Sequence, residues 1–295
     1  MTSTNGASPT KRRTKADIQD LRNAMFEMVE QAAPMTVRQV FYRGVGFGLW
    51  DKTEGDYKNV VCRLLASMRR DHDMPFDWIA DGTRWQRKPT THSSMEAALE
   101  ATARTYRRAL WDQGNWYVEV WLEKEALAGV LVDITAKWDV PLMVTRGYPS
   151  LSYLHNAGVA ISQRFTLYGQ ATSIFYLGDR DPSGDDIARK VEEDLRDFAG
   201  EEAGRLLEFT RLAVTEEQVG IFNLPTRPTK KSDSRSRNWD GSASVEVDAI
   251  DPNQLRGMVD AVIEHFIDPH QLEVLQAVEA EERRTLTELI RETGR

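Results

Sequence analysis

The sequence predicts an α/β fold in which a mostly parallel sheet follows a small helical domain. From Trp116 onward, apolar runs with strand character alternate with segments of helical periodicity, which is the pattern of parallel strands joined by helices. Before Trp116, apolar residues recur mainly at helical spacing. A chain of 295 residues with 41% hydrophobic and 28% charged residues has a globular composition and is long enough for two domains.

The composition argues against a membrane or secreted location and does not decide whether the binding partner is a nucleic acid. No apolar run approaches the ~20 residues of a membrane-spanning helix, and the first residues lack the apolar segment of a secretion signal. We therefore expect no membrane association. Cys62 is the single cysteine, which excludes an intramolecular disulfide and fits a reducing cytoplasm. The net charge of -8 argues mildly against a nucleic-acid partner, but basic residues are concentrated at 11–15, 63–88, 104–108 and 227–237.

Three helices and a strand are predicted in the first part of the chain. In order, we expect a disordered arm at 1–14, helices at 16–32, 36–48 and 56–70, and a short strand with a turn at 75–82. This is the outline of a winged helix-turn-helix domain, which we assign to residues 15–90. Its third helix would present four basic side chains to DNA: Lys58, Arg63, Arg69 and Arg70. The alternative is a small helical domain with a solvated basic face.

A linker and an alternating strand–helix region complete the chain. The capping-box pattern Ser93-x-x-Glu96 predicts a helix to about Gln113 within a linker at 91–115. In the region 116–295 we expect strands at 116–122, 141–145, 174–177, within 209–223 and at 244–250, and two final helices at 252–266 and 269–293. The basic loop 225–238 is expected to be mobile. Its Lys230 and Lys231 are candidate contacts to the DNA backbone, although a solvated loop is the commoner case.

Acidic side chains follow two of the predicted strands, at the point where each strand ends. Because parallel strands end at the same edge of a sheet, these carboxylates could converge there. Three carboxylates with several waters suit Mg²⁺, which can stabilise the transition state of phosphoryl transfer. The candidate ligands are Glu123, Asp179, Asp181 and, further along, Asp185. The alternative is that the aspartates form turns and caps, with Ser183-x-x-Asp186 as the capping box of the next helix.

Three short motifs at these strand ends resemble those of the Toprim domain. They are Glu123-Lys124, Gly147-Tyr-Pro149-Ser and Gly178-Asp179-x-Asp181-Pro182-x-Gly184. The pattern is most similar to that of topoisomerase VI A subunits and the related meiotic double-strand-break transesterases, over about residues 16–270. In that family a winged-helix domain precedes Toprim and carries a catalytic tyrosine in an Arg-x-x-Tyr/Phe-Tyr motif, which Arg38-Gln-Val-Phe41-Tyr42 resembles. Glu246-Val-Asp248-Ala-Ile resembles a late strand of that Toprim domain.

The resemblance implies a Mg²⁺-dependent enzyme that cleaves double-stranded DNA. It identifies Tyr42 as a nucleophile that remains joined to a 5′ end, with Arg38, Arg43, Glu123 and Lys124 as further catalytic residues. A tyrosine hydroxyl with pKa ~10 needs a base or a nearby cation, and Arg38 lies one helical turn before Tyr42. One tyrosine per chain cuts one strand, so double-strand cleavage requires a homodimer. In the family, the tyrosine of one protomer meets the metal of the other.

The length of the chain is similar to that of the compact Mini-A proteins of bacterial mobile elements, and we expect a cytoplasmic, nucleoid-associated protein. The chain has no Walker-type phosphate loop, so any ATP dependence would come from a separate GHKL-type ATPase resembling the topoisomerase VI B subunit. The short linker, the acidic charge and Phe41 in place of a second tyrosine depart from the family pattern.

Two other functions remain open. A Toprim-type, Mg²⁺-dependent nuclease would keep the acids, use water as nucleophile and leave Tyr42 as a packing residue, since aromatic side chains commonly fill domain cores. A non-enzymatic winged-helix regulator would bind DNA and have an inert acidic pocket.

Overall fold

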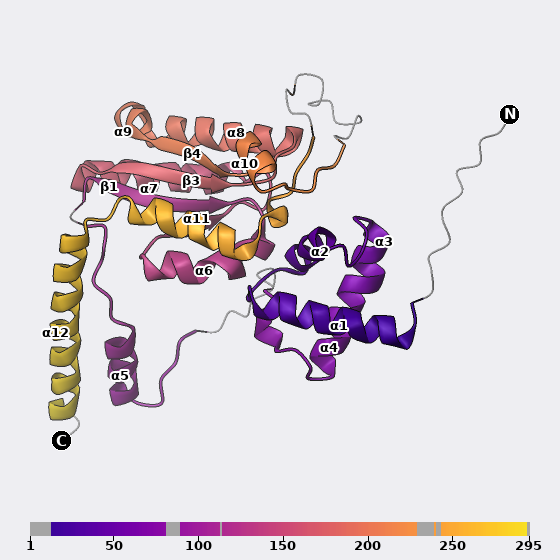
Figure 1. Cartoon of the computed structure of the whole chain (residues 1–295). Coiled ribbons are helices and arrows are strands. Elements are labelled where there is room, and N and C mark those ends of the chain that lie inside the picture. Colours follow the sequence, from indigo (N-terminus) through magenta and orange to yellow (C-terminus); the bar gives the residue numbers. More distant parts are fainter. Residues whose placement is uncertain (1–12, 81–88, 113, 229–238, 240–242, 294–295) are drawn as a thin grey trace.

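The structure, a computed structural model, describes residues 13–80, 89–112, 114–228, 239 and 243–293. The α/β fold is confirmed: within the described residues, four parallel strands form one sheet, and a unit of helices precedes it (Figure 1). We call residues 13–80 the helical unit and residues 114–293 the sheet unit. The strands are β1 (Trp116–Leu122), β2 (Leu142–Val144), β3 (Ala171–Leu177) and β4 (Glu208–Ala213), in the order β2-β1-β3-β4. Leu122 of β1 pairs with Val144 and with Leu177, so the three strands end at one edge.

Helices cover both faces of the sheet (Figure 1). Their bounds are α6 (Ala128–Lys137), α7 (Leu151–Tyr168), α8 (Pro182–Ala199), α9 (Glu201–Leu206), α10 (Glu216–Ile221) and α11 (Pro252–Glu264). Alternate side chains of a strand point to opposite faces. Val120 and Leu122 of β1 therefore pack with α6 and α11, whereas Trp121 packs with α7 and α8. Both central strands are buried from two sides, which explains their nearly continuous apolar sequences.

The helical unit consists of short helices that pack around one core. They are α1 (Lys15–Glu30), α2 (Val37–Gly46), α3 (Glu54–Asp56), the π-helical turn η1 (Tyr57–Cys62), α4 (Arg63–Arg70) and the 3₁₀ turn η2 (Phe76–Trp78). Thr14 and Thr36 each form a capping box, at the start of α1 and α2. The predicted third helix is therefore present, but it begins at Glu54 and contains a π-helical turn.

The strand predicted at 75–82 is wrong for its described part, 75–80. Residues 76–78 form η2, and Ile79 makes only an isolated parallel bridge to Met35. The Trp78 ring packs against Phe26 of α1, with 5.2 Å between ring centres, and this contact holds the segment against the helices. No β-hairpin is found among the described residues of the helical unit.

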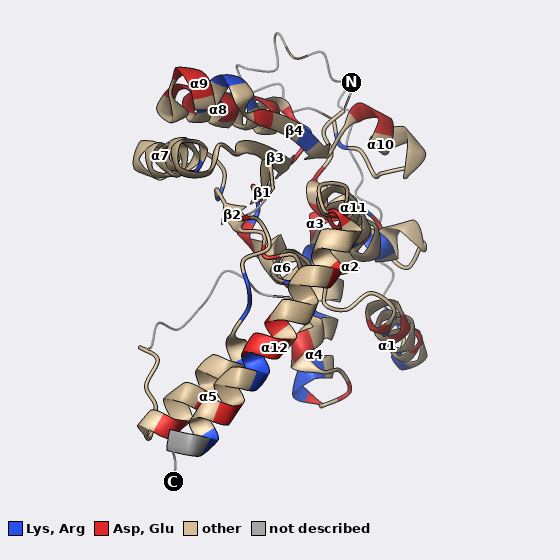
Figure 2. Cartoon of the chain, turned by 90° about the vertical axis from the view of Figure 1, so that its left-hand side faces the viewer, with Lys and Arg blue, Asp and Glu red and all other residues tan. Residues whose placement is uncertain are grey.

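Helix α12 (Pro269–Thr293) projects from the sheet unit and lies beside a helix of the linker, α5 (Met95–Thr105), and we call the two helices the arm (Figures 1 and 2). The helix expected to reach Gln113 ends at Thr105, and the N-cap of α5 is Ser94 rather than Ser93. The described residues 106–112 are not helical, and the Tyr106 hydroxyl donates to the Glu282 carboxylate of α12 at 2.8 Å. None of the helices in the described residues is both long and apolar enough to cross a membrane.

The strand predicted at 244–250 is also wrong. Ser244 and Val245 make isolated bridges, to Arg227 and Arg180, and the 3₁₀ turn η5 (Val247–Ala249) follows. The Val247 N–H donates to the Asp179 carboxylate at 2.8 Å and not to a neighbouring strand. An alternating apolar sequence is compatible with a strand, but here a side-chain acceptor replaces the ladder.

The segment from η5 to α11 packs against the start of the helical unit and joins the two units. The Thr36 hydroxyl donates to the buried Asp248 carboxylate at 2.9 Å. Arg256 of α11 donates to the Ala32 and Pro34 carbonyls at 2.9 and 3.0 Å. Residues more than 200 positions apart in sequence thus form the junction that places α2 beside the sheet edge.

Candidate active site

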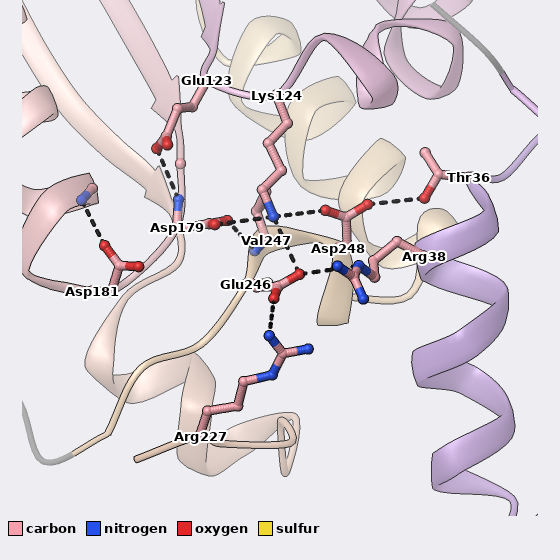
Figure 3. Close-up of polar contacts among 12 residues, drawn as sticks. Thr36, Arg38, Glu123, Lys124, Asp179, Asp181, Arg227, Glu246, Val247 and Asp248 are labelled. Atoms are coloured by element: carbon pink, nitrogen blue, oxygen red, sulfur yellow. Dashed lines mark hydrogen bonds and ion pairs between the residues drawn. The ribbon is translucent and has the colours of Figure 1, made fainter. Parts of the chain in front are cut away.

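Glu123 and Asp179 lie side by side at the edge where β1 and β3 end. The Asp179 N–H donates to Glu123 Oε2 at 3.1 Å (Figure 3). A Cβ atom on Gly178 would lie 2.6 Å from the same oxygen, so the glycine permits the close approach of this carboxylate to the backbone. Burial and, to a smaller extent, the negative charge of Asp179 together raise the pKa of Glu123 to about 7. The charged form of Glu123 is therefore disfavoured by its burial at this sheet edge.

Asp181 and Asp185, two other candidate metal ligands, have different partners. Asp181 is the N-cap of α8 and accepts from the Gly184 N–H at 2.8 Å, so the cap predicted at Ser183 is wrong. Asp185 forms an ion pair with Arg211 of β4 at 2.7 Å and accepts from the Trp239 indole at 2.5 Å. Asp185 is therefore held by these two partners, which argues against its use as a ligand.

Lys124 lies at the centre of a group of three carboxylates (Figure 3). Its Nζ is 2.9 Å from Asp248, 3.0 Å from Asp179 and 3.4 Å from Glu246. Burial alone would lower the pKa of Lys124, but the three carboxylates raise it by more, so the ammonium is retained. We call Lys124 and these three acids the Lys124 cluster. It links the end of β1, the end of β3 and the turn η5.

Tyr42, the predicted nucleophile, is close to this cluster in its own chain. It lies on α2 and is only 4% exposed. Burial raises the pKa of Tyr42, and a hydrogen bond to Glu246 also raises it, whereas Arg227 and Arg38 lower it. Arg38, four residues earlier on α2, lies 3.5 Å from Glu246 through its Nε and covers the Tyr57 ring at 4.2 Å. Glu246 thus contacts both Tyr42 and Lys124.

Unlike Arg38, which is also on α2, Arg43 does not contact Glu246 or the Lys124 cluster. Its Nη1 is 3.4 Å from Asp251, and its Nη2 donates to Gln31 at 3.2 Å. Adjacent helical residues differ in direction by about 100°. The assignment of Arg43 to the phosphate is therefore not supported by its contacts, which belong to the junction of the two units.

Four residues near Tyr42 were not among the predicted catalytic residues. Glu246 and Asp248 were interpreted as a strand that resembles the family, so their side chains were not considered as part of the site. Arg227 and Lys52 lie over the Tyr42 ring at 5.9 and 5.5 Å from its centre. The basic loop 225–238 gave a signal for Arg227, but nothing in the sequence distinguished Lys52 from other surface lysines.

The predicted DNA-binding side chains of α3 to α4 are largely at the surface. Lys58, Arg63 and Arg70 are exposed, and Figure 2 shows basic residues toward the end of α4. Lys58 lies 3.9 Å from Glu54, whereas Arg69 donates to the Leu65 carbonyl at 3.2 Å. Lys230 and Lys231 lie outside the described residues.

The acids at the sheet edge fit Mg²⁺ in part. No group of three His, Cys, Asp or Glu side chains within the described ranges is already arranged around one point. Mg²⁺ nevertheless keeps several waters and is commonly held by one or two carboxylates with substrate phosphate. Glu123 and Asp179 meet that requirement, since they lie together at the sheet edge and a divalent cation there would stabilise their charged forms against burial. Asp181 would first have to release the N-cap of α8.

No protein-family model and no curated protein matches this sequence. The function is therefore inferred from the contacts around Tyr42 and the sheet edge, together with the resemblance of their motifs.

Proposed function

We propose that this chain is a Mg²⁺-dependent, DNA-cleaving transesterase of the kind formed by type IIB topoisomerase A subunits, with a winged-helix domain and a Toprim domain. The observation that carries the proposal is the series of ion pairs that runs from Arg38, one helical turn before Tyr42, through Glu246 and Lys124 to Asp179. Three residue types that phosphoryl transfer uses, a nucleophile, cations and acids at a sheet edge, are in contact within one chain.

In the proposed reaction, the Tyr42 oxygen forms a bond to a DNA phosphorus, and the bond from that phosphorus to the 3′ oxygen breaks. The products are a 5′-phosphotyrosyl link and a free 3′ hydroxyl. The phenol proton passes to Glu246, its hydrogen-bond partner, and the leaving 3′ oxygen takes a proton from water. Arg38 stabilises the negative charge that develops near the tyrosine.

Glu123 and Asp179 would hold Mg²⁺, with Asp181 as a third ligand. When bound, the ion supplies neutralisation of phosphate charge. Lys124 keeps Asp179 and Glu246 in place through its ion pairs. The exposed basic residues of α3 to α4 would contact the backbone of double-stranded DNA.

Double-strand cleavage requires two chains, because each chain has one Tyr42. The contact of Tyr42 with Glu246 of its own chain favours a nucleophile and acids supplied by the same protomer, unlike the arrangement expected from the family. Strand passage, if it occurs, would require a separate ATPase of the GHKL type.

The test incubates the protein with labelled supercoiled DNA and Mg²⁺, followed by denaturation and detection of label on the protein. We expect a covalent adduct in the wild type and none in Tyr42→Phe or Asp179→Ala. Tyr168→Phe, a matched change of an exposed tyrosine at the end of α7, should retain the adduct. Cleavage that survives Tyr42→Phe would favour the nuclease, and DNA binding without cleavage by any form would favour the regulator.

A second measurement decides which protomer supplies the acids. Mixed dimers of a Tyr42→Phe chain and an Asp179→Ala chain, purified through two affinity tags, contain one intact tyrosine and one intact acid site on different chains. A site within one protomer leaves these dimers inactive. Recovery of adduct in the mixed dimer would show that the site is shared between protomers.

A further inference from the structure

Three cationic side chains from separate segments surround Tyr42. Lys52 and Arg227 lie over its ring, and Arg38 lies on the same face of α2. The Glu246 carboxylate forms ion pairs with two of these cations. Its Oε1 is 2.6 Å from Arg227 Nη1, and its Oε2 is 3.5 Å from Arg38 Nε. The arrangement around Tyr42 is thus a set of cations with a carboxylate between them.

Within the described residues, the three cations around Tyr42 have two carboxylate partners, Glu246 and the more exposed Glu54. Arg38 Nη1 is buried and makes no hydrogen bond within the described residues, and its ion-pair partner Glu54 lies 3.6 Å away with a largely exposed side chain. Lys52 Nζ donates to the Thr226 carbonyl at 2.7 Å, which is a neutral acceptor. Burial and, to a smaller extent, the neighbouring Arg227 lower the pKa of Lys52 to about 8, whereas Glu246 acts in the opposite direction. A second anion would therefore be stabilised at this position.

We propose that Arg38, Lys52 and Arg227 form a subsite for a phosphate anion, and that the Glu246 carboxylate is an internal anion that the phosphate replaces on the two arginines. This inference rests on the proposed function only in naming the anion as the phosphate that Tyr42 attacks. Arginine binds carboxylate and phosphate oxygens with the same forked geometry, so one can take the place of the other. Glu246 keeps its contacts with Lys124 and Tyr42 during the exchange.

The exchange also gives Tyr42 access to its substrate. Tyr42 is 4% exposed, whereas the Arg227 side chain is 40% exposed and lies over the ring. Movement of Arg227 from Glu246 to a phosphate would bring that phosphate to the tyrosine. Arg227 is thereby assigned as a catalytic residue that touches the substrate. Its backbone is fixed by two hydrogen bonds with Ser244, at 2.8 and 2.9 Å, so only the side chain needs to move.

The experiment measures the binding of inorganic phosphate to the full chain by isothermal titration calorimetry, at constant ionic strength and without Mg²⁺ or DNA. Arg227→Gln should weaken binding about tenfold, because one charge-assisted hydrogen bond is lost. Glu246→Gln should strengthen binding about tenfold, because the competing charge is removed. Arg284→Gln is the matched control: this arginine pairs with Glu281 on the arm, far from Tyr42, and binding should not change.

Equal phosphate affinity in Arg227→Gln and Arg284→Gln would overturn the subsite, as would unchanged affinity in Glu246→Gln. Circular dichroism melts check that each variant is folded. If Glu246→Gln does not fold, the pair of arginine variants decides alone. Phosphate binding with the expected pattern but no covalent DNA adduct would retain the subsite and reject the transesterase. A covalent DNA adduct without that pattern of phosphate affinities would retain the transesterase and reject the subsite.

Discussion

The junction of the two units and the projecting arm both contain several ion pairs, but the pairs differ in the sequence separation of their partners and in the burial of their side chains. In the arm, Arg283 pairs with Glu279 and Arg284 with Glu281, one helical turn apart on α12. At the junction, Lys124 pairs with Asp248, whose side chain is 3% exposed, across 124 positions of sequence. Exposed pairs are screened by water and stabilise little, whereas a buried charge that loses its partner is costly. We therefore expect the two regions to respond very differently to similar substitutions.

The largest effect should come from Lys124→Met. The change leaves three carboxylates, two of them largely buried, without their shared cation. The free energy of unfolding should fall by about 3–5 kcal/mol, measured by urea denaturation at pH 7. Lys137→Met is the control, since Lys137 pairs with Asp260 at the surface and its loss should cost about 1 kcal/mol or less. Similar losses in both variants would contradict the contrast between junction and surface.

A smaller loss is expected from Thr36→Val, which tests the contact between the units. Thr36 caps α2 and also donates to Asp248, so its removal should cost about 2 kcal/mol. Thr14→Val removes a comparable exposed capping box without an inter-unit bond and should cost about 1 kcal/mol. Thermal or urea unfolding measures both. Equal losses would mean that the bond to Asp248 adds no stability.

Glu119 is a third case, a buried carboxyl that forms no ion pair within 4 Å in the part of the chain that the structure describes. Its carboxylate accepts from the Trp121 indole at 2.7 Å, and burial raises the pKa of Glu119 in the folded protein. An acid whose folded pKa is raised is most favourable to stability below its unfolded pKa of about 4.5, and this contribution is lost as the pH rises toward the folded pKa. Glu119→Gln should therefore be more stable than the wild type at pH 8, by about 1 kcal/mol for each unit of pKa difference.

The advantage of Glu119→Gln should shrink as the pH falls from the raised folded pKa of Glu119 to its unfolded pKa. Denaturation curves of both proteins from pH 4 to 8 measure it. A difference that is constant with pH would show that Glu119 does not titrate differently in the folded state.

The smallest effect is expected in the arm. Arg284→Ala removes an ion pair in which both side chains are more than 60% exposed. The free energy of unfolding should change by less than about 0.5 kcal/mol. A larger loss, seen in the same urea experiments, would mean that the arm makes contacts that its exposure does not reveal.

The sequence predicted local features well and side-chain partners poorly. Capping by Thr36 and the strand β1 follow from a few consecutive residues, and both were found. Glu123 and Asp179 lie together because parallel strands end at one edge, although their role as metal ligands stays a prediction. Asp185 was assigned to the metal but pairs with Arg211. An aspartate near a strand end can cap a helix, bind a metal or form an ion pair, and the sequence alone does not distinguish these roles.

The partners of Lys124 show why the rest could not be predicted. Glu246 and Asp248 lie within a segment of strand-like alternation, and only the tertiary fold places them beside the lysine that follows β1. Periodicity reports which face of an element is buried, but it does not report which distant charge a side chain meets. The same limit applies to Arg43, whose partner Asp251 lies at the start of α11.

The hydrogen bond from Thr36 to Asp248 spans 212 positions, which sets an order of events during synthesis. A ribosome adding about 5–20 residues per second needs roughly 10–40 s to make the second residue after the first. Throughout that interval the start of α2 and Tyr42 lack the segment that covers them. The junction surface of the nascent helical unit therefore stays exposed until nearly the whole chain has been translated.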